Sequence, residues 1–226
     1  MCAESQSLIP SWHVQFASLA RAGRNSDSIP GWHAMVFSYF DDSSDERRTK
    51  YFAAGGLIGG EDQWFTFDLQ WLDATRDLNK PFRSTECECQ HGQFKNWTKP
   101  RCNALMDRLV TVIRFYALMG FASIVPIGAY RRVFPNSGEF DPYYLAVTHT
   151  IINMATIGHN IHHNVKLWLE DSSSTKASSN RIYDDLKELK GWAPGRRLKG
   201  ISFDPKSLCP LQAADLVARE AFKHID

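Results

Sequence analysis

Several acidic residues that are far apart in the chain have surroundings in which carboxylates can bind cations or take part in catalysis. The set is Asp41, Asp42, Glu86, Glu170 and Asp215. The first two end a short apolar run, the next two follow extended segments, and the last lies among apolar and small residues near the start of the final helix pattern. Burying carboxylates costs several kcal/mol unless they are paired or bind a cation. We therefore expect these acids to converge and to hold divalent metal.

Carboxylates from separate segments are donors that suit hard divalent cations. Mg²⁺ and Mn²⁺ prefer oxygen ligands and octahedral geometry. Two such ions about 4 Å apart can activate a water molecule and stabilise the leaving oxygen when a phosphodiester is cleaved. The acids therefore predict a Mg²⁺ or Mn²⁺ site, and phosphodiester hydrolysis is the chemistry that such a site supports.

The elements that must position these acids alternate between strands and helices in the second half of the chain. Expected strands are 35–42, 51–58, 121–127, 164–169 and 197–203, and expected helices are 61–77, 100–119, 142–158, 181–190 and 211–224. A turn is expected from Ser43, an extended piece at 81–86 and a loop at 87–97. This order predicts an α/β fold, with a mixed sheet flanked by helices. Sites in such sheets form outside the carboxyl ends of the strands.

Composition limits the class of protein. The 226 residues, with 43% hydrophobic and 23% charged content, suit one well-cored globular domain. A net charge of +1 means that any site for a polyanion such as nucleic acid must be a local patch. We expect no membrane span and no signal peptide, because apolar runs are short and the first residues are polar. Five cysteines without a disulfide pattern favour a reducing, cytoplasmic setting.

The chain divides at about residue 33. Residues 1–33 are rich in Ser, Gly, Asn and Pro with scattered aromatics, and we interpret them as an N-terminal arm that packs on the domain or on a partner. Residues 34–226 carry the alternating strand and helix pattern and form the expected domain. The sequence leaves open a protein partner or a homo-oligomer.

Several blocks of this domain resemble those of the DUF3800 family, in the family's order. Residues 37–44, Phe-Ser-Tyr-Phe-Asp-Asp-Ser-Ser, resemble its YxDDSG or YxDESG opening. Residues 81–86, Pro-Phe-Arg-Ser-Thr-Glu, resemble its FHxTD/E block, and residues 92–97 resemble the GxFxxW continuation. Residues 165–170 resemble its acid-ending strand, and residues 210–218 its LQxADxxA helix. The match runs from about residue 34 to the end.

The resemblance implies an RNase H-like fold and a metal-dependent nuclease site. It implies as metal ligands Asp41, Glu86, Glu170 and Asp215, and we add Asp42 as a further candidate ligand. The chain departs from the pattern twice, with Ser44 in place of the usual glycine and Arg83 in place of the usual histidine. If that histidine assists catalysis in relatives, activity or substrate is altered here, whereas Arg83 can hold a phosphate. The expected partner is nucleic acid, DNA or RNA.

Other interpretations stay open beside this one. The chain can be a catalytically inactive binding or scaffold module of a multi-protein defence or mobile-element system, or a hydrolase of nucleotides rather than polymers. Asp41 can be a turn residue, and Asp215 can pair with Arg219 at i+4. A zinc site is a weaker alternative, because the spacing lacks paired knuckles. Its ligands would be Cys87, Cys89, His91 and Cys102.

Histidine and basic clusters also carry chemistry that the acids do not use. His159 and His163 have the i, i+4 spacing of metal ligands but lack an accompanying glutamate. The basic clusters are Arg131-Arg132 and Arg196-Arg197-Lys199. Such clusters are either solvated faces or contacts to phosphate groups.

Overall fold

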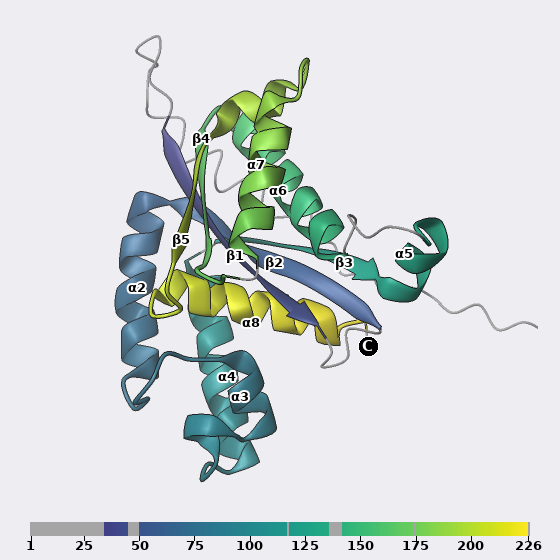
Figure 1. The fold of residues 1–226 in the computed structure, drawn as a ribbon. Helices are drawn as coiled ribbons and strands as arrows, with labels where there is room; N and C mark the ends of the chain where they lie inside the picture. The colour runs from purple at the N-terminus through teal and green to yellow at the C-terminus, as the bar shows by residue number, and fades with distance from the viewer. Residues whose placement is uncertain (1–33, 45–49, 117, 136–141, 174, 226) are drawn as a thin grey trace, which may run out of the picture. The chain divides into compact units, whose positions relative to one another are not determined.

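Short runs of aromatic, β-branched and small residues form one five-stranded sheet in the computed structural model (Figure 1). The structure describes residues 34–44, 50–116, 118–135, 142–173 and 175–225. The strands are β1 (Met35–Ser44), β2 (Tyr51–Gly60), β3 (Met119–Pro126), β4 (Asn164–Glu170) and β5 (Leu198–Asp204). Their order is β3-β2-β1-β4-β5, and β2 is antiparallel to both of its neighbours. β1, β4 and β5 run parallel, which makes the sheet mixed as predicted.

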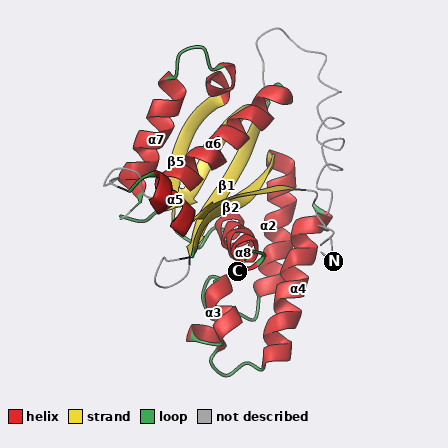
Figure 2. Cartoon of the chain, turned by 90° about the vertical axis from the view of Figure 1, so that its right-hand side faces the viewer, coloured by secondary structure: helices red, strands yellow, loops and turns green. Residues whose placement is uncertain are grey.

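Helices cover both faces of this sheet (Figure 2). They are α2 (Glu61–Thr75), α3 (Ser84–Cys89), α4 (Lys99–Phe115), α5 (Ile127–Val133), α6 (Pro142–Asn160), α7 (Lys176–Glu188) and α8 (Cys209–Lys223), with 3-10 turns η3 (Gly92–Phe94) and η4 (Ala193–Arg197). One core lies between the sheet and α6 and α7, and a second lies between the sheet and α2, α4 and α8. The predicted α/β fold class is therefore confirmed.

Alternation along β1 decides which core each side chain enters, because successive residues of a strand point to opposite faces. Val36 and Phe40 are buried in the core beneath α6. Phe37 and Tyr39 pack against the core beneath α2 and α8. The same alternation assigns Asp41 to the α8 face and Asp42 to the α6 face.

Small residues bring α8 close to the sheet. A Cβ atom at Gly55 of β2 would lie 3.0 Å from the Cα atom of Ala218 in α8. Gly55 is the register partner of Asp41 on β1. Asp215 precedes Ala218 by about one helical turn and so lies on the same side of α8. The close contact therefore holds this carboxylate near the end of β1.

Some expected boundaries were wrong for reasons that lie in tertiary contacts. Ser43 and Ser44 continue β1, in register with Ala53 and Phe52, instead of starting a turn. The segment expected to be extended up to Glu86 becomes helical at Ser84. The reason is tertiary, since the Ser84 N–H donates to the distant Asp215 carboxylate at 2.7 Å.

Two helices also differ from expectation. α7 begins at Lys176, five residues before the expected start at residue 181, because Ser179 is buried and its hydroxyl lies 2.6 Å from that of Tyr143. In α2, only half of the aromatic and leucine side chains are buried. Trp64, Phe67 and Trp71 are buried, whereas the exposed side chains are Phe65, Leu69 and Leu72.

The expected arm, residues 1–33, and residues 45–49 lie outside the described residues. Among the helices that the structure describes, none combines the length and the apolar character needed to cross a membrane.

Replacing Gly55 by valine should weaken the fold, because the new side chain meets the backbone of α8. We expect Gly55→Val to lower the free energy of unfolding by about 2–3 kcal/mol in urea denaturation. The matched control is Gly120→Val on β3, where the nearest atom to a new Cβ is 3.7 Å away on a flexible leucine. It should change stability by less than about 0.5 kcal/mol. Equal effects in the two variants would contradict the close packing of α8.

Candidate functional site

Two of the predicted ligands lie side by side at the carboxyl ends of parallel strands. Tyr39 of β1 is the register partner of Trp168 on β4, and their rings stack at 5.3 Å. Asp41 and Glu170 each follow two residues later, on the same face of the sheet. The parallel register therefore places the two carboxylates next to each other on one face of the sheet, toward the carboxyl ends of β1 and β4.

Asp215 approaches this edge from α8. Its Oδ2 atom accepts the Ser84 N–H at 2.7 Å, and its side chain is 14% exposed. The alternative partner, Arg219, instead donates from Nε to Glu88 Oε2 at 2.7 Å. The i+4 ion pair expected as the competing interpretation is therefore not formed, and Asp215 faces the sheet edge.

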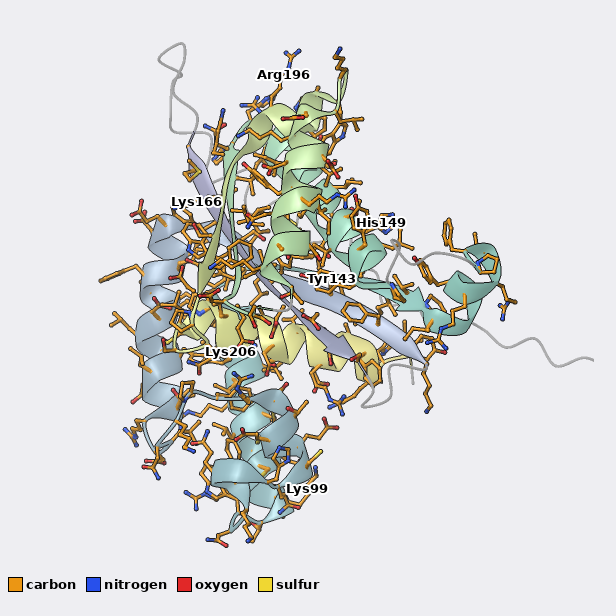
Figure 3. The ribbon with its side chains drawn as sticks, in the orientation of Figure 1. Lys99, Tyr143, His149, Lys166, Arg196 and Lys206 are labelled. Carbon is orange, nitrogen blue, oxygen red and sulfur yellow. The ribbon has the colours of Figure 1, made fainter. Side chains whose placement is uncertain are left out.

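The three carboxylates converge on one ammonium group. It belongs to Lys206, in the loop between β5 and α8 (Figure 3). Its Nζ atom donates to Asp41 Oδ2 and lies 3.4 Å both from Glu170 Oε2 and from Asp215 Oδ1. Only 4% of the lysine side chain is exposed. The structure thus brings together acids from β1, β4 and α8 around a single positive charge.

Arg83 adds a second cation at the rim of this cluster. Its Nη2 atom lies 2.7 Å from Glu170 Oε1, and its side chain is 43% exposed. Three carboxylates facing one lysine and one arginine leave a formal charge of −1. The predicted phosphate holder is therefore at the site, with one of its donors engaged by a carboxylate.

Burial and mutual repulsion govern the protonation of the cluster. Burial raises the pKa of Asp41 to about 7, against the opposing effect of Lys206 and with help from the charge of Asp215. Burial alone would lower the pKa of Lys206, but the carboxylates, led by Asp41, outweigh it and raise that pKa. The ammonium therefore stays charged, while the acids carry more negative charge than one lysine neutralises.

The structure does not bring the other predicted ligands into contact with these three. Asp42 lies on the α6 face, where its charge helps to raise the pKa of Tyr143, although burial is the larger cause. Glu86 lies in α3, and its carboxylate is packed against the position that a side chain at Gly92 would occupy. Neither acid has a contact to Lys206 among the described residues.

The donor set fits a hard cation, although a lysine already lies in it. Among the described residues, no group of three or more His, Cys, Asp or Glu side chains is arranged to hold a metal ion directly. At the acid site, the Lys206 ammonium lies between the carboxylates. All the oxygen atoms that face this ammonium are nonetheless of the kind that Mg²⁺ and Mn²⁺ prefer. A divalent ion would be held by Asp41, Glu170 and Asp215 in place of the ammonium.

The zinc and histidine alternatives find no support in the described part of the chain. Cys87 and Cys102 are buried free thiols, and Cys89 is an exposed one. His163 has its Nδ1 atom 2.6 Å from the Ile161 carbonyl oxygen, at the end of α6. Neither set forms a metal-binding group in the residues that the structure describes.

Lys206 is the functional residue that sequence reasoning missed. It follows Pro205 in the connection between β5 and α8 and has no motif of its own. Its position could have been inferred from topology alone. Because β5 is parallel to β4, the loop that follows β5 must leave the sheet at the edge where the acids lie.

Comparisons with known proteins give a likeness of fold only. No family model matches the chain, and no curated protein does. The structure is similar to one described as the crystal structure of Bst-RNase HIII in complex with Mn²⁺, at 11% sequence identity and a TM-score of 0.49. The match covers 99% of this chain and 58% of that chain, so our chain spans little more than half of its length.

Removing the lysine should expose the repulsion that it now relieves. We expect Lys206→Met to lower the free energy of unfolding by roughly 3–5 kcal/mol at pH 8, because three buried carboxylates lose their shared cation. Lys176→Met is the matched control, since Lys176 is 46% exposed and pairs with the half-exposed Asp171. Its effect should stay below about 1 kcal/mol. Similar losses in both variants, measured by urea denaturation, would contradict the central role of Lys206.

A half-buried acid of α2, Asp68, should give a measurable pH dependence of stability. Burial raises the pKa of Asp68 in α2 to about 6, and its Oδ1 atom has no hydrogen-bond partner among the described residues. A raised carboxyl pKa means that the folded state binds the proton more tightly, so stability falls as pH rises from about 4 to 6. We expect Asp68→Asn to make this fall smaller and to gain about 1 kcal/mol above pH 7, allowing for partial exposure. Parallel pH profiles for the two proteins would contradict it.

Proposed function

We propose that the protein hydrolyses phosphodiester bonds of nucleic acid with Mg²⁺ or Mn²⁺, on an RNase H-like sheet. One observation carries the proposal, the convergence of three carboxylates from separate elements on a single cationic atom, Lys206 Nζ. Carboxylates placed this way bind cations, and their net negative charge favours a divalent ion over a monovalent one. The residues proposed to hold the ion are Asp41, Glu170 and Asp215.

Each residue of the cluster then has a distinct task. A bound divalent ion supplies an activated water molecule and charge stabilisation at the leaving oxygen. The Ser84 N–H fixes the orientation of the Asp215 carboxylate through its 2.7 Å hydrogen bond. Arg83 has further N–H donors beyond the one on Glu170, and its partial exposure lets them receive a phosphate oxygen. Lys206 neutralises the acids while no metal is bound.

Glu86 and Asp42 remain proposed metal ligands, although among the described residues neither contacts Lys206 as the other three acids do. Glu86 lies on α3, the same short helix whose first N–H holds Asp215. Asp42 neighbours Asp41, although it lies on the opposite face of β1. The variants Glu86→Gln and Asp42→Asn distinguish a three-carboxylate site from a larger one. Each substitution should weaken Mn²⁺ binding only if the residue that it replaces is a metal ligand.

A second candidate function is a catalytically inactive nucleic-acid-binding module. The observation that favours it is that each of the three carboxylates already has a partner in the protein. Lys206 contacts all three, Arg83 pairs with Glu170, and Ser84 donates to Asp215. On this alternative the cluster is a structural ion-pair network, and nucleic-acid affinity is unaffected by a chelator.

Cleavage assays should separate the two candidates. We expect Mn²⁺-dependent cleavage of labelled DNA or RNA by the wild type. Asp41→Asn and Asp215→Asn should each lower the cleavage rate by at least on the order of 100-fold. Losing a metal ligand should lower activity more than losing a residue that only hydrogen-bonds to a ligand. A parallel assay with mononucleotides tests whether the substrate is a polymer.

The control variant for this experiment is Asp171→Asn, which neighbours Glu170 but pairs with Lys176 at 2.9 Å on the surface. It should keep full activity. Circular dichroism of all variants shows whether they remain folded. Full cleavage by folded Asp41→Asn and Asp215→Asn proteins would eliminate the metal mechanism, and no cleavage by the wild type with any metal would favour the binding module.

A further inference from the structure

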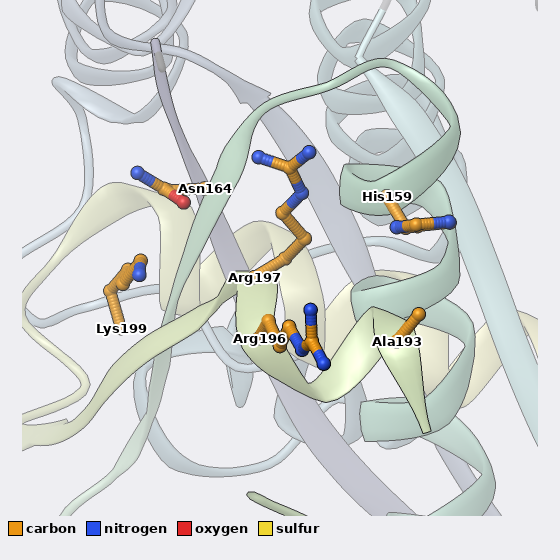
Figure 4. Close-up of a pocket in the computed structure, with 6 residues that line it drawn as sticks. All are labelled: His159, Asn164, Ala193, Arg196, Arg197 and Lys199. Atoms are coloured by element: carbon orange, nitrogen blue, oxygen red, sulfur yellow. The ribbon is translucent and has the colours of Figure 1, made fainter. Parts of the chain in front are cut away.

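A basic pocket lies at the opposite end of β4 from the acids (Figure 4). It is a hollow of about 330 Å³. Its lining residues are His159, Asn164, Ala193, Arg196, Arg197 and Lys199. None of these residues is acidic, and they come from three parts of the fold, the end of α6, the start of β4 and the segment from η4 into β5.

Close packing at the end of α6 shapes this pocket. A Cβ atom at Gly158 would collide with Val165 of β4 and would lie 3.8 Å from the Cβ atom of Arg197. Glycine therefore lets α6 end directly against β4 and η4. The last carbonyl groups of α6 accept backbone N–H groups of the following turn, including Gly158 C=O from His163 N–H at 2.8 Å. This capping leaves the helix end with fewer free carbonyl groups to repel an anion.

The cations of the pocket have no acidic partner in the described structure. Arg196 and Lys199 are exposed and Arg197 is half-buried. None of the ion pairs among the described residues involves these three side chains. Arg83 and Arg219, by contrast, each form an ion pair with a glutamate. The positive charge of the pocket is therefore not neutralised by acidic side chains among the described residues.

Asn164 adds an uncharged polar side chain to the lining of the pocket. Its side-chain Oδ1 position is buried and has no hydrogen-bond partner among the described residues. Buried polar atoms are normally satisfied by protein or bound groups. Since the two ends of an amide are interchangeable by a flip, the Asn164 side chain can offer an N–H₂ donor as well as a carbonyl acceptor. Guanidinium forks, an ammonium and an amide together suit the oxygens of a phosphate group.

The position of the pocket relates it to the acid site. Asn164 begins β4 and Glu170 ends it, on the same face of the sheet. Six residues of strand span about 20 Å. A nucleic-acid strand advances about 3.4 Å along the helix axis per phosphate, so a backbone that passes both sites carries several phosphates between them.

We propose that this pocket binds a backbone phosphate of the nucleic acid whose scissile bond lies at the acids, several nucleotides away. The inference rests on the proposed function for the identity of the ligand. It explains how a protein with a net charge of +1 can hold a polyanion, because the positive charge is gathered where the backbone passes.

Binding measured without metal tests the inference separately from cleavage. The probe is a labelled 20-nucleotide strand annealed to its complement, made once as a DNA duplex and once as an RNA duplex. The protein is titrated into each probe in EDTA at several salt concentrations, and binding is followed by fluorescence anisotropy. Arg196→Ala/Lys199→Ala should weaken binding by at least about 10-fold and lower the slope of log K against log salt by about 1 to 2. The matched control is Arg131→Ala/Arg132→Ala on α5, which removes the same charge from another exposed pair.

The outcomes are distinguishable. A loss confined to the pocket variant supports the inference, and equal losses in both variants overturn it in favour of a general charge effect. A second arm titrates inorganic phosphate and a mononucleotide. If the pocket variant no longer binds these small ligands but binds the 20-nucleotide probe as tightly as the wild type, the proposed backbone contact is overturned. The pocket is then a site for a small phosphorylated ligand. Pocket-dependent binding without metal-dependent cleavage overturns the proposed hydrolysis and leaves the phosphate contact standing.

Discussion

The buried ammonium of Lys206, surrounded by the carboxylates of Asp41, Glu170 and Asp215, is the interaction on which this part of the structure depends. Three acids at this position would repel one another strongly without a cation, since each lies largely out of water. The lysine lets β1, β4 and α8 meet at one sheet edge. The same geometry that makes the lysine necessary makes the site attractive to a divalent ion.

Backbone features, rather than the acids themselves, bring the cluster together. Parallel register of β1 and β4 sets Asp41 beside Glu170, and the small residues Gly55 and Ala218 let α8 lie close enough to add Asp215. β4 reaches both sites, because Glu170 at its end belongs to the acid cluster and Asn164 at its start lines the basic pocket. The acidic and basic groups therefore lie near opposite ends of one strand, while the net charge of the protein stays near zero.

Local sequence patterns predicted the parts of the site that local forces decide. Strand alternation placed Asp41 and Glu170 after short apolar runs, and the apolar neighbours of Asp215 indicated burial. Lys206 could not be recognised, because its role comes from the topology of the β5–α8 connection and not from its neighbours. The helix that contains Glu86 was missed because a hydrogen bond from Ser84 to Asp215, far apart in the sequence, supports its first turn.

The most direct test is a crystal structure of the protein soaked in Mn²⁺, with anomalous scattering to locate the ions. Our account predicts manganese bound by Asp41, Glu170 and Asp215, with the Lys206 ammonium displaced from between them. Strong manganese peaks elsewhere, with the lysine still bridging the three carboxylates at saturating metal, would contradict it.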